Sequence, residues 1–190
     1  MKTVFTFILS SFTFYAVAQP ATEVMLFDVR KNSGGIVISN MSNISKNKGY
    51  DSQPSFDPKL SRVYYSSARQ DGRTDIRSYD WKTGQTTELT QTPEREYSPV
   101  ITPDGKNFSC IIQRDNGAQD LGAYPLAGGP PEILIDNLTI GYHAWLSNRE
   151  VIVFVLGEPH TLRLVVPGGG EELTLTSNIG RSLHKIPGTA

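Results

Sequence analysis

The chain has 190 residues, of which 38% are apolar and 19% are charged, and its mean hydropathy is −0.28. This length allows one domain or two small ones, and the composition excludes a multi-span membrane protein and a disordered chain. The 18 basic and 19 acidic residues give a net charge of −1 without a basic cluster, which argues against nucleic-acid binding, and the single cysteine excludes a disulfide framework and a multi-thiolate metal site.

Residues 1–18 are predicted to form a signal peptide. Lys2 supplies a short positive region, residues 4–15 are mostly apolar, and Ala16-Val17-Ala18 fits the small-x-small rule for cleavage. The apolar stretch is too short to span a bilayer. We therefore expect cleavage before Gln19 and an exported protein, periplasmic or secreted, with a buried N-terminal strand or a short anchor as the alternative.

From residue 21 onward the sequence predicts short strands. Apolar residues occur in short runs bounded by Gly, Pro, Asn and Asp, and no long window has helical periodicity. Asp71-Gly72, Asp104-Gly105 and Asn116-Gly117 are hairpin dipeptides, because their glycines tolerate a positive φ. In chain order, the predicted strands are 24–30, 35–40, 62–67, 75–80, 86–90, 107–113, 121–126, 132–136, 151–156, 161–166 and 172–176.

The predicted strands repeat with a period of 41–45 residues. Residues 50–78 align with 95–123 at an offset of 45, and the aligned pairs are Pro54 with Pro99, Pro58 with Pro103, Arg69 with Arg114, Gly72 with Gly117, and Asp75 with Asp120. A period of this length with four strands per unit is typical of a β-propeller blade. A β-sandwich with accidental spacing is the alternative, which the matched Pro, Gly and Asp positions disfavour.

The predicted fold class is therefore all-β, a β-propeller of four-stranded antiparallel blades within residues 19–190. Its parts are a half-blade at 22–46, blades at 50–94, 95–139 and 140–180, and the start of another blade at 183–190. The innermost strands are predicted at 54–56, 99–101, 143–145 and 183–188. About three and a half blades are present, so we expect an open or incomplete ring. Its uncovered end faces would make the chain marginally stable and prone to self-association. A compact four-bladed ring is the alternative.

Two segments carry a more specific resemblance. YSPVITPDGK at 97–106 resembles the signature of the TolB-like, WD40-like propeller repeat, and SARQDGRTDI at 67–76 resembles the turn that follows in the same repeat. A degenerate copy of the first stands at 52–59, and the third copy, near Trp145, has lost Pro-Asp-Gly. The resemblance covers 21–188 and implies a propeller of usually six blades, so the chain is expected to be a truncated portion. It also implies a role in the envelope of a Gram-negative bacterium, where TolB contacts a peptidoglycan-associated lipoprotein.

No catalytic motif is present: Gly-x-Ser-x-Gly, a P-loop and a dinucleotide fingerprint are all absent from the sequence. The candidate ligand-binding residues are those predicted on innermost strands or at blade starts, facing the channel or its rim: His143, His184, Trp145, Tyr97 and Tyr142. The two histidines occupy matching places 41 residues apart, although a structural role for each is the alternative. Some propeller lyases use channel histidines with a metal, which here would need acidic groups beside them.

Three further expectations concern structure. Cys110 is expected to be a buried small apolar side chain, and His160 to lie on the surface in a turn. Arg69 and Asp75, like Arg114 and Asp120, are expected to pair across one hairpin instead of binding calcium.

The function predicted from the sequence is that of an exported, non-enzymatic binding module. It has no cofactor or metal, does not span a membrane, and binds a protein or peptide partner in the cell envelope, with a small-molecule ligand as a further candidate. The alternatives are a propeller-fold lyase or hydrolase with a channel site, and an inactive fragment of a longer protein.

Overall fold

A computed structural model of the chain describes residues 21–170 and 172–186, so the predicted signal peptide lies outside the described residues. The described residues form strands and turns without a helix, as expected for an all-β chain. The strands are β1 (Met25–Asn32), β2 (Gly35–Asn43), β3 (Asp51–Phe56), β4 (Arg62–Ala68), β5 (Thr74–Asp80), β6 (Gln85–Glu88), β7 (Arg95–Ile101), β8 (Asn107–Gln113), β9 (Gln119–Pro125), β10 (Glu132–Ile135), β11 (Ile140–Trp145), β12 (Val151–Val155), β13 (Thr161–Val165) and β14 (Glu172–Ser177).

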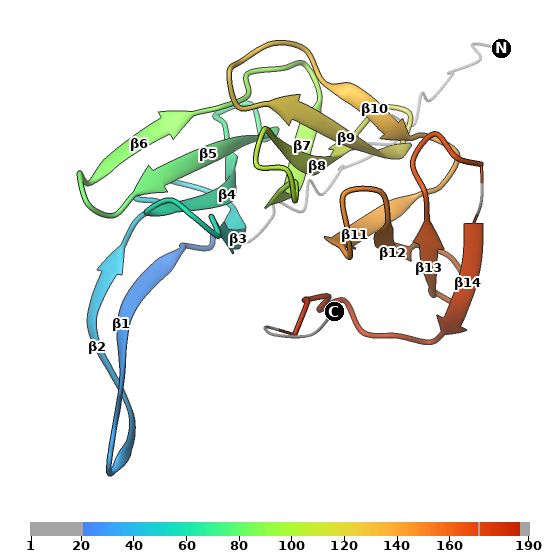
Figure 1. Cartoon of the computed structure of the whole chain (residues 1–190). Helices are drawn as coiled ribbons and strands as arrows, with labels where there is room; N and C mark the ends of the chain where they lie inside the picture. Colours follow the sequence, from blue (N-terminus) through green and yellow to red (C-terminus); the bar gives the residue numbers. More distant parts are fainter. Residues whose placement is uncertain (1–20, 171, 187–190) are drawn as a thin grey trace, which may run out of the picture.

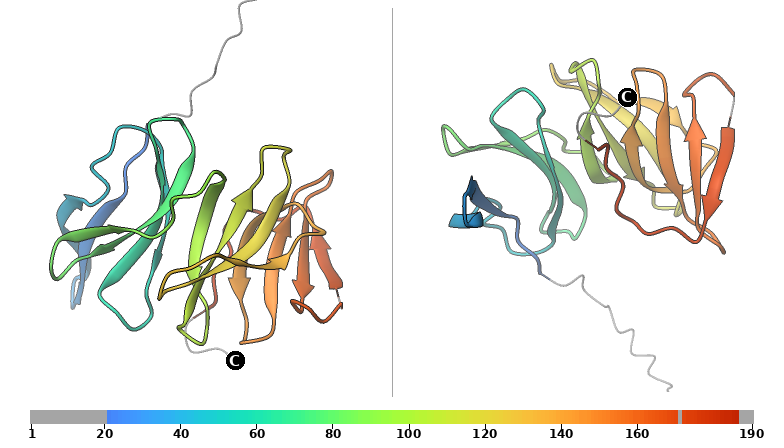
Figure 2. Two further views of the ribbon diagram at one scale, coloured as in Figure 1. Left: turned by 90° about the horizontal axis from the view of Figure 1, so that it is seen from above. Right: turned by 60° about the horizontal axis from the view of Figure 1, so that its bottom comes forward.

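The strands form one hairpin and three four-stranded antiparallel sheets. The hairpin is β1–β2, the first sheet is β3–β6, the second is β7–β10 and the third is β11–β14, each in sequence order. The sheets follow one another around an arc, with β3, β7 and β11 on its inner side (Figure 1). The hairpin and the third sheet stand at opposite ends of the arc and do not meet in any of the three views (Figures 1 and 2). The structure is therefore an incomplete propeller, as the sequence predicted.

Each boundary between successive sheets contains its own apolar cluster. Val24 and Ile44 of the hairpin region pack with Val63 and Tyr65 of β4. The opposite face of β4 contributes Tyr64 to a second cluster with residues of the second sheet, and a third cluster joins the second and third sheets. Because both faces of β4 are covered, every residue from 63 to 68 is buried. Its apolar residues Val63, Tyr64 and Tyr65 are accordingly consecutive instead of alternating, and Ser66 and Ser67 are buried beside them.

The predicted turns and pairs are also present. Gly72, Gly105 and Gly117 have φ values of 81°, 72° and 88°, which is the conformation that the Asp-Gly and Asn-Gly turns require. Arg114 Nε lies 2.9 Å from Asp120 Oδ2, and Arg69 Nε lies 3.4 Å from Asp75 Oδ2. Cys110 is fully buried, and burial raises the pKa of its thiol well above the ordinary value. His160 is half-buried, with its ring centroid 5.0 Å from that of Phe154.

One expected element is not formed. Residues 183–188 were predicted to be an innermost strand, but 178–186 is irregular and contains no strand, and 187–190 lies outside the described residues. A strand needs a hydrogen-bonding neighbour, and the strand pairings of the described residues do not include this stretch. The segment instead returns from β14 toward the inner side of the arc, beneath β11 (Figure 1).

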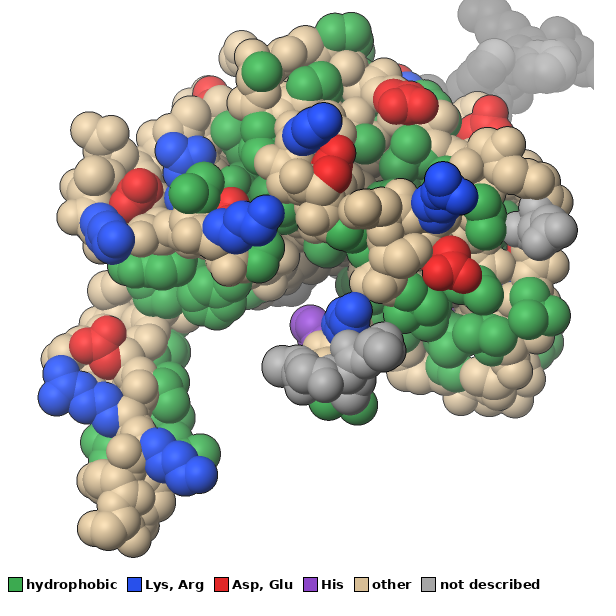
Figure 3. Space-filling view, in the orientation of Figure 1, with side chains coloured by type: hydrophobic (Ala, Val, Ile, Leu, Met, Phe, Trp, Pro, Cys, Tyr) green, Lys and Arg blue, Asp and Glu red, His purple; other side chains and the backbone are tan. Residues whose placement is uncertain are grey.

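The hairpin exposes a continuous apolar face. Val29 and Ile38 are cross-strand partners and are 65% and 64% exposed. Ile36 is 71% exposed and stands opposite Lys31, two residues along the same face. Apolar side chains follow the edge of the hairpin that faces the opening of the arc (Figure 3). This face is the uncovered end expected of an incomplete ring.

Candidate functional site

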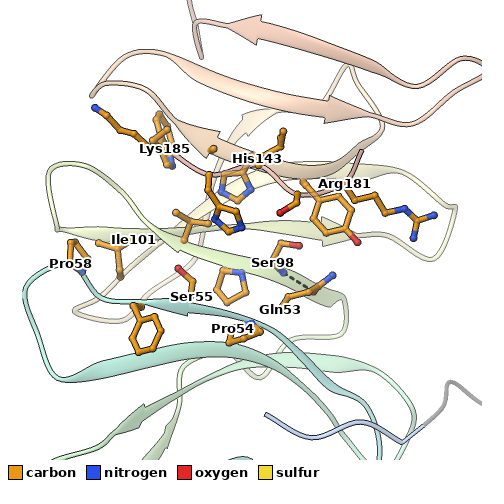
Figure 4. A pocket seen from close by; sticks show the side chains of 18 of the residues that line it. Gln53, Pro54, Ser55, Pro58, Ser98, Ile101, His143, Arg181 and Lys185 are labelled. Atoms are coloured by element: carbon orange, nitrogen blue, oxygen red, sulfur yellow. Dashed lines mark hydrogen bonds between the residues drawn. The ribbon is translucent and has the colours of Figure 1, made fainter. Parts of the chain in front are cut away.

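A cavity of about 870 Å³ lies on the inner side of the arc and is referred to here as the channel cavity. Its walls come from β3, β7 and β11 and from residues 181–185 (Figure 4). The apolar wall consists of four prolines and three aromatic side chains, together with Ile101 and Val100: Pro54, Pro58, Pro99, Pro103, Phe56, Tyr142 and Trp145. The volume falls within the range of about 300–1,000 Å³ that is usual for ligand sites.

Two equivalent bulges shape the wall of the channel cavity. Gln53 on β3 and Ser98 on β7 each precede a proline, and their φ values are 55° and 54°. A positive φ is uncommon for residues other than glycine and costs about 1–3 kcal/mol. The strain is offset by two hydrogen bonds. Gln53 Oε1 accepts the Ser98 N–H of the next sheet at 3.0 Å (Figure 4), and it accepts the Ser66 hydroxyl of its own sheet at 3.1 Å.

A second polar contact joins the next pair of sheets. The Trp145 indole N–H on β11 donates to Ser109 Oγ on β8 at 2.8 Å, and His143 Nε2 lies 2.7 Å from the same oxygen. The Ser109 hydroxyl also lies 3.2 Å from the Val100 carbonyl. These bonds are all satisfied when His143 Nε2 carries the proton, since Ser109 then accepts twice and donates once to Val100.

That assignment leaves His143 Nδ1 as an acceptor without a hydrogen bond. His143 is only 4% exposed, and burial lowers its pKa to about 4, so the ring is neutral at physiological pH. Ser98 Oγ is likewise buried without a hydrogen-bonding partner among the described residues. Both residues line the channel cavity. Both atoms are shielded from solvent, as are five other side-chain atoms of the described residues that lack a hydrogen bond, so neither atom identifies a ligand site by itself.

The charged side chains of the channel cavity are basic. Arg181 and Lys185 come from the irregular C-terminal segment, and Lys185 Nζ donates to the Leu146 carbonyl at 3.4 Å. Among the described residues, no Asp or Glu lines the cavity. A partner that enters would therefore meet an apolar wall with positive charge at one side.

The structure brings together four of the five predicted site residues. His143, His184, Trp145 and Tyr142 line the channel cavity. Tyr97 does not: its ring packs edge-on against Tyr50 at a centroid distance of 6.5 Å and lines a different cavity. Tyr97 precedes the bulge at Ser98, so it belongs to the other end of β7, a consequence of the bulge that the repeat spacing does not reveal.

The described residues contain no group of three or more His, Cys, Asp and Glu side chains that could hold a metal ion. The convergence of His143 and His184 with carboxylates, which a metal-dependent lyase would need, is therefore not observed. Residues 21–170 and 172–186 also include no helix with the length and apolar character needed to cross a membrane.

Some residues of the site were not identified from the sequence. Ser109 is 34 residues from His143, and nothing in its strand FSCII marks it as a partner of another sheet. Gln53 was visible as the residue before a repeated proline, but its positive φ was not expected. Arg181 and Lys185 lie on either side of the predicted His184 in the sequence. Their position in this short basic segment is the sequence feature that could have identified them as site residues.

Comparison with known proteins supports the fold. No protein-family model and no curated protein sequence matches the chain. Among solved structures, a protein assigned as TolB in Agrobacterium tumefaciens matches 80% of this chain with a TM-score of 0.65 and 19% identity. TolB from Acinetobacter baumannii matches 83% with a TM-score of 0.59 and 19% identity. The chain covers 61% and 42% of those two structures, so it spans less than two thirds of each. It has a TolB-like propeller fold.

Proposed function

We propose that this protein is an exported binding module that holds a protein or peptide segment from the cell envelope in the channel cavity. The observation that carries the proposal is the rigid apolar wall of the channel cavity, with the basic side chains Arg181 and Lys185 beside it.

The apolar wall favours a peptide over a small polar molecule. Prolines and aromatic rings present a rigid surface that loses little conformational entropy when it becomes covered. Phe56 is 63% exposed on this wall, and its ring packs edge-on against Trp81 at 5.9 Å, so the exposed ring is already held in place. The basic side chains Arg181 and Lys185 favour a segment with an acidic residue.

The envelope setting rests on the TolB-like fold and on the predicted signal peptide at residues 1–18. Enzymatic activity is not proposed, because the sequence has no catalytic motif and the channel cavity brings no carboxylate beside its histidines. A general acid–base pair, or a nucleophile with its base, would have to lie within hydrogen-bond reach of a substrate there. Ser109 and His143 are in contact, but Ser109 is fully buried and is not exposed to a substrate.

Site-specific photo-crosslinking in cells tests the proposal. A photoreactive amino acid replaces Tyr142, which lines the channel cavity, or Ile133, which is 38% exposed on β10 and does not line it. We expect a discrete crosslinked partner from position 142 and none from position 133. Crosslinks to the same proteins from both positions, or none from position 142, would contradict a partner in this cavity.

A further inference from the structure

A second cavity, of about 430 Å³, lies at the opposite end of the innermost strands, between the first and second sheets. The residues that precede β3, the turn after β4 and the start of β7 enclose it, whereas the channel cavity lies along the later residues of β3 and β7. The two cavities share no lining residue. We call this second cavity the rim cavity.

The charged side chains that line the rim cavity are all basic. Lys48, Arg69 and Arg95 line it, and no Asp or Glu among the described residues does. Lys48 is exposed and makes no ion pair or side-chain hydrogen bond with the part of the chain that the structure describes. Arg69 and Arg95 are paired with carboxylates outside the lining, so Lys48 is the lining cation without an ion pair among the described residues.

Neighbouring groups hold the two arginines in place. Arg95 donates to Asp115 at 2.9 Å, and Asp115 also accepts from Arg73 at 3.2 Å, so one carboxylate joins a turn of the first sheet to the second sheet. Arg69 donates to the Thr92 carbonyl at 2.7 Å through a terminal nitrogen, and its Nε lies 3.3 Å from Asp71 Oδ1 and 3.4 Å from Asp75 Oδ2. These contacts use one terminal nitrogen of Arg95, and one terminal nitrogen and Nε of Arg69, so the other terminal nitrogen of each guanidinium group keeps its N–H donors. Such fixed donors suit an oxyanion.

The internal repeat provides a comparison. At an offset of 45, the positions of Lys48, Gln70 and Arg95 are taken by Pro93, Asp115 and Ile140, and the strand pairing places Val155 where Gln113 stands. The same place in the next repeat therefore has one carboxylate and lacks two of the three cations. The next repeat forms the same four-stranded sheet without basic residues at the positions of Lys48 and Arg95. These two residues are therefore not required by the propeller architecture.

We propose that the rim cavity is a binding site for a small organic oxyanion, a carboxylate or a phosphate ester. Its anionic group would lie among Lys48, Arg69 and Arg95, and its remaining part against the rings of Tyr50 and Tyr97. The volume fits a ligand of this size and is too small for a folded partner. The site is independent of the channel cavity and of the function proposed for it.

Calorimetric titration of the full mature chain with inorganic phosphate and, separately, with succinate tests the proposal. Ionic strength is held constant, because salt screens exposed charges over about 10 Å at 0.1 M. We expect saturable one-site binding of at least one probe. The probe that binds with the higher affinity identifies the class of anion, phosphate or carboxylate. Lys48→Glu should weaken that binding at least tenfold, and Lys48→Gln should weaken it less.

Lys82→Glu is the matched control. Lys82 is an exposed lysine in the turn between β5 and β6 and lines neither cavity, so its reversal changes the net charge by the same amount. It should leave the affinity unchanged, and far-ultraviolet circular dichroism should show that all variants are folded. Equal weakening by Lys48→Glu and Lys82→Glu, or no saturable binding of either probe, would overturn the proposal.

Discussion

The side chain of Gln53 on β3 accepts the backbone N–H of Ser98 on β7 at 3.0 Å, and both residues have a left-handed backbone at equivalent places of adjacent sheets. This hydrogen bond therefore connects the bulge on β3 to the bulge on β7, and the two bulges together determine the shape of the channel wall.

Replacement of Gln53 tests this contact. Gln53→Ala removes the acceptor but keeps the unfavourable φ, so we expect a loss of about 1–2 kcal/mol in the free energy of unfolding. Gln53→Gly loses the same bond and relieves the strain, and it should be about 1 kcal/mol more stable than the alanine variant. Urea unfolding measures both. Equal stabilities of the two variants would show that the strain is not significant.

Ser109 should be the more sensitive position. Ser109→Ala leaves the Trp145 indole N–H and the His143 ring without their shared partner at the boundary of two sheets, and we expect a loss of about 2–3 kcal/mol. Ser55→Ala is the control, since Ser55 also lines the channel cavity but makes no side-chain hydrogen bond among the described residues. It should change the urea midpoint little. A similar midpoint for both variants would contradict a bridging role for Ser109.

His143 should make the fold sensitive to acid. Its folded pKa of about 4 lies below the ordinary 6.5, so the unfolded chain binds more protons between these values. The contribution of the neutral ring is complete above pH 6.5 and is lost as the pH falls toward 4, by up to about 3 kcal/mol.

His143→Gln cannot be protonated and should remove this dependence. The buried carboxyls of Glu96 and Asp75 have raised pKa values and change stability in the opposite sense, but they are present in both proteins. The difference in unfolding free energy between wild type and His143→Gln, measured at pH 7 and at pH 4.5, therefore isolates the histidine. A difference that does not change with pH would contradict the burial argument.

The exposed face of the β1–β2 hairpin should cause self-association. Ile38→Lys places a charge in the middle of this face, beside Val29, and should lower the weight-average mass in sedimentation without loss of stability. Val37→Lys is the control, because Val37 stands opposite Arg30 on the other face. We expect it to leave association unchanged. Equal effects of the two substitutions would show that general charge, not this face, governs solubility.

Much of the fold could be predicted because the sequence features of a propeller repeat act on neighbouring residues of the chain. The matched prolines, the Asp-Gly turns and the apolar runs each determine a strand or turn within a few residues. The contacts that build the cavities could not be predicted in this way. Ser109 meets His143 only because two sheets pack together, and Tyr97 leaves the channel because a bulge precedes Pro99. The repeat alignment suggested a strand at 183–188, but a strand also depends on a hydrogen-bonding neighbour.

The affinity of the captured partner for channel variants tests the central claim most directly. With the partner that crosslinks to position 142 in hand, its dissociation constant is measured for Tyr142→Ala and for Ile133→Ala. Truncation of an aromatic side chain in a binding wall typically costs more than 1 kcal/mol, so Tyr142→Ala should weaken binding about tenfold. Ile133→Ala should leave it unchanged. Equal affinities for both variants would contradict binding in the channel cavity.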